Sequence, residues 1–148
     1  MANKTIALAS DQAGYPLKAV LAKVLKELDY EVLDFGTQST DSVDYPDYIV
    51  PLAGAIKEGK AFAGVLVCGS GMGMCMGANR YPFIRAALIR TIEDALLSRQ
   101  HNDANVAVFG GRVTSDKDAV DALKVFLTTP FMEGHHTPRI EKLTNLPR

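Results

Sequence analysis

Hydrophobic residues follow two alternating spacings along this chain, and the alternation predicts strands separated by helices. Five short apolar runs predict strands at residues 5–10, 31–35, 63–67, 85–89 and 106–109. Between these runs the apolar residues recur every three or four positions, which predicts amphipathic helices. We place the helices at residues 16–28, 48–58, 92–101 and 115–129, with one more directly after the glycines that follow residue 67.

Strands and helices in this order imply an α/β fold. We expect a three-layer αβα sandwich around a five-stranded parallel sheet, Rossmann-like, with strand order 2-1-3-4-5. Residues 1–148 should form a single domain that ends in a helical tail, residues 131–148. The tail helix is apolar and lies outside the alternating pattern, so we expect it to pack on a second subunit. Ligands of such sheets bind beyond the carboxyl ends of the strands, here between the first and third strands.

The third strand ends in a cysteine followed by glycines at alternate positions, Cys68-Gly69-Ser70-Gly71-Met72-Gly73. A strand that turns into a helix through such a stretch leaves backbone N–H groups that can bind an anion or a developing oxyanion. Their partial charges would favour a Cys68 thiolate and lower its pKa, although a free cysteine is also often a small buried hydrophobe. The stretch matches neither dinucleotide-binding nor NTPase phosphate-binding loops. Met74 stands where a cysteine phosphatase needs an arginine.

Each of the other candidate residues has a structural alternative. Asp11 follows the first strand and either caps the next helix or faces Cys68 across the crevice. His101 is either a cation at a helix C-terminus or a catalytic group. Four residues late in the chain either form a phosphate clamp or are solvated: Arg112, His135, His136 and Arg139. We expect Cys75 to serve packing and three further arginines to be surface charge: Arg85, Arg90 and Arg99.

Composition and charge restrict the expected partners to small molecules and other protein chains. The chain has 148 residues and a formal net charge of −1, so it offers no basic field to nucleic acid or to a membrane surface. No apolar run reaches the length of a membrane span, and the first residues lead into a strand without a signal-peptide pattern. We therefore expect a cytoplasmic protein. Six residues separate Cys68 from Cys75, which suits neither a disulfide scaffold nor a Cys-x-x-Cys pair.

Several motifs together resemble one enzyme family. They are Ala9-Ser10-Asp11-Gln12-Ala13-Gly14-Tyr15, Asp34-Phe35-Gly36-Thr37, Asp44-Tyr45-Pro46, residues 67–73, Ala78-Asn79-Arg80, residues 98–105 and Gly110-Gly111-Arg112. On these motifs the sequence resembles the ribose-5-phosphate isomerase B and galactose-6-phosphate isomerase family, and within it the ribose-5-phosphate enzymes most. The resemblance implies a homodimer or tetramer that interconverts ribose 5-phosphate and ribulose 5-phosphate in the pentose phosphate pathway. It implies no metal and no organic cofactor.

The resemblance also implies catalytic roles for individual residues. Cys68 would be the base that moves a proton between C1 and C2 of the sugar. Ser70 would help to hold the enediolate oxygens, together with backbone amides of the glycine stretch: Gly69, Gly71, Met72 and Gly73. Asp11 and His101 would open the furanose ring, with His101 as the proton donor. Sites of this family combine residues of two subunits.

The implied substrate contacts include two departures from the family pattern. Asn102 matches a sugar-binding position, and the phosphate-binding positions hold Arg112, His135, His136 and Arg139. Gln12 stands where the family usually has histidine, and His135 where it usually has arginine. Both changes make the site less cationic, so we expect phosphate binding that is weaker or more dependent on pH. Two alternatives follow: an isomerase of another phosphosugar (allose 6-phosphate, galactose 6-phosphate or a tetrose phosphate), or a phosphosugar-binding module without activity.

Overall fold

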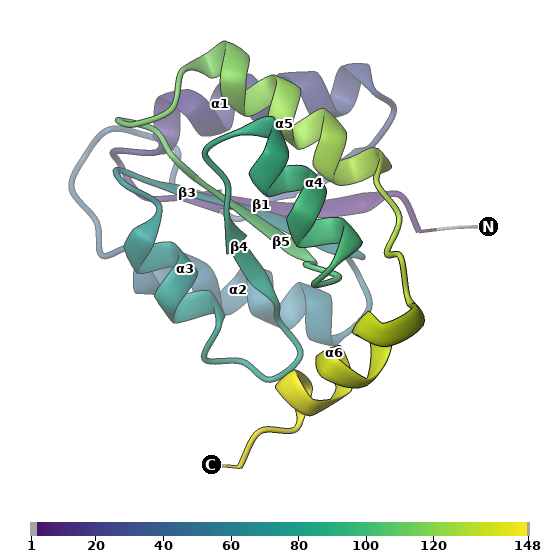
Figure 1. Cartoon of the computed structure of the whole chain (residues 1–148). Helices are drawn as coiled ribbons and strands as arrows, with labels where there is room; N and C mark the ends of the chain where they lie inside the picture. Colours follow the sequence, from purple (N-terminus) through teal and green to yellow (C-terminus); the bar gives the residue numbers. More distant parts are fainter. Residues whose placement is uncertain (1–2, 148) are drawn as a thin grey trace.

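Five parallel strands form the centre of the molecule, and helices cover both faces (Figure 1). The computed structural model describes residues 3–147. In chain order the elements are β1 (Thr5–Ser10), α1 (Tyr15–Glu27), β2 (Glu31–Asp34), α2 (Pro46–Lys57), β3 (Ala63–Cys68), α3 (Met72–Ala78), β4 (Ala86–Leu88), α4 (Ile92–Gln100), β5 (Val106–Gly110), α5 (Asp116–Thr128), the 3-10 helix η1 (Gly134–His136) and α6 (Thr137–Thr144). The predicted α/β architecture is confirmed.

The strand order is β2-β1-β3-β5-β4, so the predicted order 2-1-3-4-5 is wrong for the last two strands. Every residue of β5 is buried, whereas the three residues of β4 are all partly exposed. The more apolar strand therefore takes the inner place beside β3, from the pair Gly64–Val106 to the pair Cys68–Gly110, and β4 forms the edge. Placing the longer apolar strand inside buries more apolar surface, which favours this order.

This order determines which helices share a face of the sheet. The chain moves outward from β3 to β4 and then back to β5, so right-handed crossovers put α3 and α4 on opposite faces. Helices α1, α4 and α5 pack together on one face, and α2 packs with α3 on the other, as Figure 1 shows.

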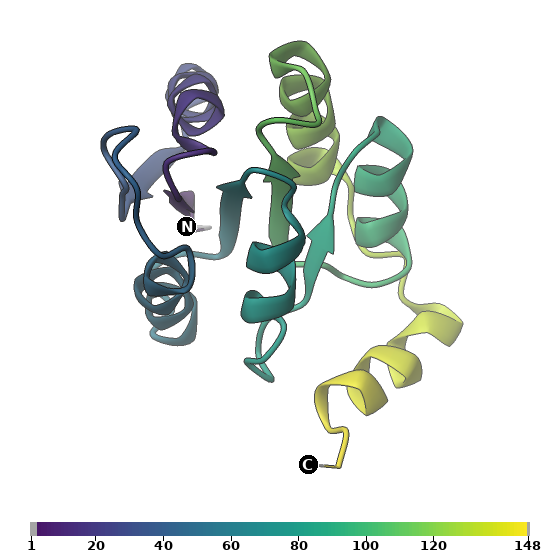
Figure 2. The same cartoon turned by 90° about the vertical axis from the view of Figure 1, so that its left-hand side faces the viewer.

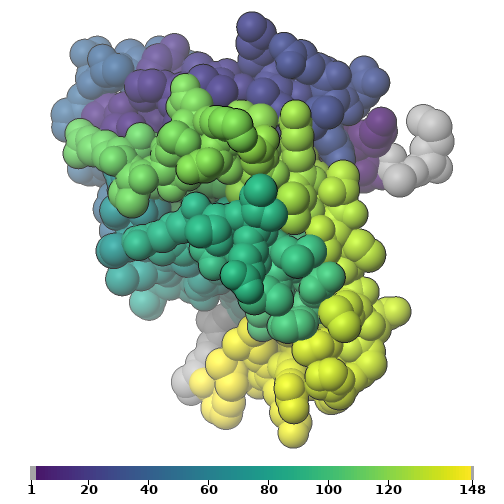
Figure 3. Space-filling view, turned by 45° about the horizontal axis from the view of Figure 1, so that its top comes forward, coloured from purple at the N-terminus to yellow at the C-terminus, as the bar shows by residue number. Residues whose placement is uncertain are grey.

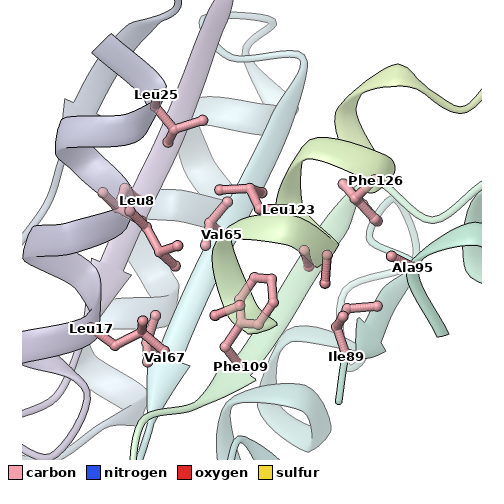
Figure 4. Close-up of a cluster of buried hydrophobic side chains, with 14 of the residues drawn as sticks. Leu8, Leu17, Leu25, Val65, Val67, Ile89, Ala95, Phe109, Leu123 and Phe126 are labelled. Carbon is pink, nitrogen blue, oxygen red and sulfur yellow. The ribbon is translucent and has the colours of Figure 1, made fainter. Parts of the chain in front are cut away.

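Each face has its own apolar core. The core beneath α1, α4 and α5 is drawn in Figure 4, where Leu8, Val65 and Phe109 point from the strands toward Leu17 and Leu123 of the helices. Alternate strand residues, such as Ala9 and Leu66, point to the other face. A fully buried leucine or phenylalanine contributes about 1.5–3 kcal/mol, so these two clusters hold the three layers together.

Local signals set most helix ends. The Thr91 hydroxyl accepts a hydrogen bond from the Asp94 amide (3.1 Å), which confirms the predicted cap at the start of α4. Ser115 caps α5 in the same way. Helix α2 starts two residues earlier than predicted, at Pro46, and continues through Pro51. A proline at the first helical position costs nothing, because that N–H has no partner within the helix in any case.

The tail leaves the sandwich after α5. It passes beside α4 (Figure 3) and ends in α6, which projects from the body of the molecule in Figure 2. No residue of α6 is buried, and Leu143 and Leu146 are 48% and 60% exposed. Within residues 3–147, no helix is both long and apolar enough to cross a membrane.

Candidate active site

The carboxyl ends of β1, β3 and β5 meet at one edge of the sheet, and the loops that follow them are joined by backbone hydrogen bonds. The Asp11 amide donates to the Val67 carbonyl (3.2 Å), and the Gly111 amide donates to the Cys68 carbonyl (2.8 Å). The strand order reverses between β1 and β3, which is where α/β sheets bind ligands. The loops are therefore fixed in place around Cys68.

Glycine at position 14 lets the loop after β1 approach β3 closely. A Cβ atom at this position would lie 2.4 Å from the Val67 carbonyl oxygen, a distance that no packed side chain adopts. The Asp11 carboxylate accepts a hydrogen bond from the Gly14 amide at Oδ1 (2.9 Å), and Asp11 is buried. Asp11 therefore caps the turn and also lies in the crevice that the sequence predicts.

Cys68 is the last residue of β3 and is 5% exposed. The chain turns at Gly71, whose φ of 82° belongs to the left-handed region, and a Cβ there would lie 2.6 Å from Leu88 Cδ1. Ser70 Oγ accepts a hydrogen bond from the Met72 amide (3.2 Å). This amide is thus engaged within the loop, while the Ser70 hydroxyl keeps its own proton available for donation.

The loop before α2 lies against the glycine stretch. A Cβ on Gly73 would be 2.6 Å from Cζ and 2.9 Å from Oη of Tyr45, so only glycine lets the tyrosine ring lie there. Gln12 Oε1 accepts a hydrogen bond from the Val43 amide of the same loop (3.1 Å). Tyr45 received no role from the sequence, although it stands in one of the motifs, directly before the proline that opens α2.

Arg112 places a permanent positive charge beside the glycine stretch. Its amide donates to the Gly69 carbonyl (3.0 Å), and its guanidinium Nη1 would lie 3.6 Å from a Cβ on Gly69. The Arg112 side chain is exposed and can bind an anion there in a bidentate way. We refer to Asp11, Cys68, residues 69–73 and Arg112 as the carboxyl-edge group.

Cys75 has a different environment from Cys68. Its thiol donates to the Ala86 carbonyl (3.7 Å) and accepts from the Asn79 side-chain amide (3.6 Å). Burial raises the pKa of Cys75, because a thiolate is poorly solvated there. A protonated, hydrogen-bonded thiol agrees with the expected packing role.

The other candidate residues lie at the opposite edge of the sheet. Helix α4 runs antiparallel to the strands, so His101 at its C-terminus lies near their amino ends. The carbonyl of Asp103, two residues later, accepts a hydrogen bond from Arg85, which directly precedes β4. The tail adds three more side chains at this edge. We refer to His101, Asn102, His135, His136 and Arg139 as the amino-edge group.

The structure therefore brings the predicted site residues together in two groups rather than one. Asp11 is hydrogen-bonded to Val67, the residue before Cys68, and Arg112 lies against Gly69 on the other side of Cys68. His101 and Asp11, the pair expected to act on the furanose ring, lie at opposite edges of the same chain. A single copy of the chain does not unite all the candidate residues.

A buried carboxylate, a thiol beside a glycine-rich turn and a nearby guanidinium form a site suited to proton transfer on an anionic substrate. Comparison with known proteins agrees. A family model described as Ribose/Galactose Isomerase matches residues 6–143. The chain belongs to this family and is a sugar phosphate isomerase.

Relatives with known names and structures cover almost the whole chain. Ribose-5-phosphate isomerase B of Escherichia coli is 38% identical over 141 residues, which is 95% of either chain. A ribose 5-phosphate isomerase of Thermotoga maritima has a similar structure, with a TM-score of 0.94 and 43% identity over 97% of this chain and 99% of that one. Ribose-5-phosphate isomerase B of Mycoplasma genitalium, solved with bound ribulose-5-phosphate, has a TM-score of 0.91 and 35% identity over 95% and 93% of the two chains.

Proposed function

We propose that this sugar phosphate isomerase interconverts ribose 5-phosphate and ribulose 5-phosphate through a cis-enediolate, without a metal or an organic cofactor. The observation that carries the proposal is the position of Cys68 at the end of β3. The glycine stretch follows it directly, and the Arg112 side chain lies against Gly69 of that stretch. The ribulose-5-phosphate bound to the Mycoplasma genitalium homologue supports the choice of sugar.

Cys68 acts as the base in the central step. Its thiolate removes the proton from C2 of the open-chain aldose, a C1=C2 double bond forms, and negative charge develops on O1. A proton passes from O2 to O1, and the Cys68 thiol then returns its proton to C1, which leaves the ketose carbonyl at C2. One base on one face of the enediolate can therefore serve both transfers.

The glycine stretch stabilises the negative charge that develops on the substrate oxygens. The backbone amides of Gly69, Gly71 and Gly73 donate to the enediolate oxygens, whereas the Met72 amide stays bound to Ser70. The Ser70 hydroxyl accepts from the Met72 amide, so its proton points to a different acceptor, for which O1 or O2 is suited.

Opening of the furanose ring needs the amino-edge group of a second copy. Asp11 accepts the proton of the anomeric hydroxyl, and a His101 from the other copy protonates the ring oxygen. The same copy supplies Asn102 to the sugar, and His135 and Arg139 to the phosphate, opposite Arg112. We infer a homo-oligomer with sites shared between copies.

The tail supports this arrangement. A cavity of about 380 Å³ lies between α6 and the edge strand β4. Its lining includes Leu143 and Leu146 of the tail, Ile84 and Asn102. Exposed leucines beside a cavity are typical of a surface that another protein chain covers. A second copy seated there would lie next to Asn102 and the rest of the amino-edge group.

Turnover of ribose 5-phosphate in buffer with a chelator tests the proposal. Cys68→Ala should reduce kcat by about 10³-fold, the usual contribution of a general base, and should leave substrate binding in place. Cys75→Ala is the matched control and should remain active, because its thiol serves packing. If Cys68→Ala is as active as the control, the base lies elsewhere.

A substrate panel separates the neighbouring functions. Allose 6-phosphate, galactose 6-phosphate and a tetrose phosphate are compared with ribose 5-phosphate by kcat/KM. We expect ribose 5-phosphate to have the highest value. A higher kcat/KM for a six-carbon or four-carbon sugar would identify that sugar as the preferred substrate in place of ribose 5-phosphate. Tight binding with no turnover of any sugar would indicate a binding module.

A further inference from the structure

The fold gathers all three histidines of the chain into one stack. The ring centroids of His101 and His136 are 4.6 Å apart, and the rings are nearly parallel at 14°. His135 lies on the same ring, with its centroid 4.0 Å away and its plane tilted by 38°. His136 therefore packs against both of the other imidazoles.

Backbone hydrogen bonds hold the stack together across two distant parts of the chain. The Met132 amide donates to the Gln100 carbonyl (3.0 Å), next to His101, and the His136 amide donates to the Glu133 carbonyl (3.1 Å). Glu133 and Gly134 both have positive φ angles, 60° and 59°, and this reversal turns His136 back toward α4. The packing of His136 on His101 is thus built into the loop and does not depend on the side chains alone.

The three rings differ in exposure. His136 is 8% exposed and also lies near the Phe131 ring, whereas His135 is exposed and His101 is intermediate. Burial lowers the pKa of His136, and the positive charges of His135, His101 and Arg139 act in the same direction. His136 is therefore neutral near pH 7. A phosphate ligand is usually exposed and cationic, and His136 is neither.

We propose that His136 is a positioning residue, whose buried ring fixes the orientation of both His101 and His135. This inference rests on the proposed function, in which His101 donates a proton to the ring oxygen and His135 binds phosphate. A flat, neutral ring holds His101 in one orientation without adding a charge next to its proton. Catalytic groups that are held in this way lose activity when they shift by roughly 1 Å.

Kinetics of three variants test the role. His136→Phe keeps a flat aromatic ring and removes the nitrogens, so kcat and KM should stay within about threefold of wild type, since the ring that packs on His101 is retained. His136→Ala removes the ring and should lower kcat by about 10- to 100-fold, with a much smaller change in KM. Arg139→Gln is the matched clamp variant and should raise both KM and the inhibition constant of inorganic phosphate.

Two kinetic results would overturn the inference. If His136→Phe raises the inhibition constant of inorganic phosphate as much as Arg139→Gln does, His136 is a phosphate ligand. If His136→Ala keeps the kcat of wild type, the stack does not position a catalytic group. Met132→Ala, in the same loop and with an exposed side chain, controls for general loosening of the tail.

NMR titration gives a readout that does not depend on activity. Since the chain has only three histidines, their ring signals can be assigned with single variants. We expect His136 to have a pKa below the ordinary value of histidine, and the His101 ring protons to show an upfield ring-current shift that His136→Phe keeps and His136→Ala abolishes. Absence of that shift in the wild type would refute the stack. Absence of isomerase activity with the shift present would refute the proposed function instead.

The pH dependence of unfolding adds a check with a defined sign. A histidine whose folded pKa is lowered binds fewer protons in the folded state than in the unfolded state, so stability falls as pH falls through that window. As pH is lowered from 7 into the acid range, the free energy of unfolding measured with urea should therefore fall less for His136→Phe than for the wild type. An unchanged pH dependence would contradict the buried, neutral state of His136.

Discussion

The carboxyl-edge and amino-edge groups are held in place by different means. The carboxyl-edge group stands on strand ends, and its loops meet at Gly14, Gly71 and Gly73, where a Cβ would approach other atoms to 2.4–2.6 Å. The amino-edge group depends on the packing of its own imidazoles and on a tail whose last helix, α6, has no buried residue. The carboxyl-edge group is thus fixed by strand ends and close backbone packing, whereas the amino-edge group is fixed by one loop and by the packing of its rings.

The two groups also differ in the kind of positive charge they offer. Arg112 carries a guanidinium that stays charged at every physiological pH. The amino-edge group offers the Arg139 guanidinium together with the His135 imidazole, at a position where the family pattern has a second arginine. We therefore expect the phosphate to be held by a guanidinium from each edge, with a weaker contact at His135.

Gly14→Ala should have the largest effect on stability, and it changes the close packing that holds the carboxyl-edge group in place. The added Cβ would overlap the Val67 carbonyl, so we expect a loss of about 3 kcal/mol, at the upper end for overpacked sites. Urea unfolding measures the change. The Cys68 loop should also become less well ordered, with a fall in kcat.

Gly54→Ala is the matched control for this substitution. Gly54 lies within α2, and nothing lies within 4 Å of a Cβ built there. Alanine should stabilise the helix by about 0.5–1 kcal/mol. If both variants show the same stability, the close approach at Gly14 does not support the site.

His135→Arg should have a smaller effect, and it acts on the charge difference between the two groups. Arginine adds a permanent charge and a second donor at this position, so we expect KM for ribose 5-phosphate to fall by roughly fivefold, the equivalent of about 1 kcal/mol for one charge contact. Initial rates at one fixed pH measure the change. A KM that is unchanged in the variant would remove position 135 from the clamp.

Much of the fold can be predicted from the sequence because periodicity and caps are local. The first strand matches its prediction, residues 5–10, and the cap of α4 forms at Thr91 as expected. The places of β4 and β5 in the sheet could not be predicted, because they depend on which strand finds more apolar neighbours. Arg85 and Arg99 are not the free surface charges we expected, since both bind Asp103.

The candidate site is predictable to a similar extent. Asp11 directly follows β1 and Cys68 ends β3, and because these strands are neighbours in the sheet a sequence pattern can indicate that the two residues share one crevice. The contact between His101 and His136 joins α4 to a loop beyond α5, so no local pattern points to it. The separation of His101 from Asp11 follows from the direction of α4 and becomes visible only once the layers are assembled.

Complementation between two inactive variants tests most directly whether one site takes its two groups from two copies. Cys68→Ala and His101→Ala are co-expressed and compared with each variant alone, using ribose 5-phosphate. With random pairing in a dimer, about a quarter of the sites would combine an intact Cys68 with an intact His101, so the mixture should recover about a quarter of wild-type activity. A mixture no more active than the sum of the separate variants would contradict a site shared between copies.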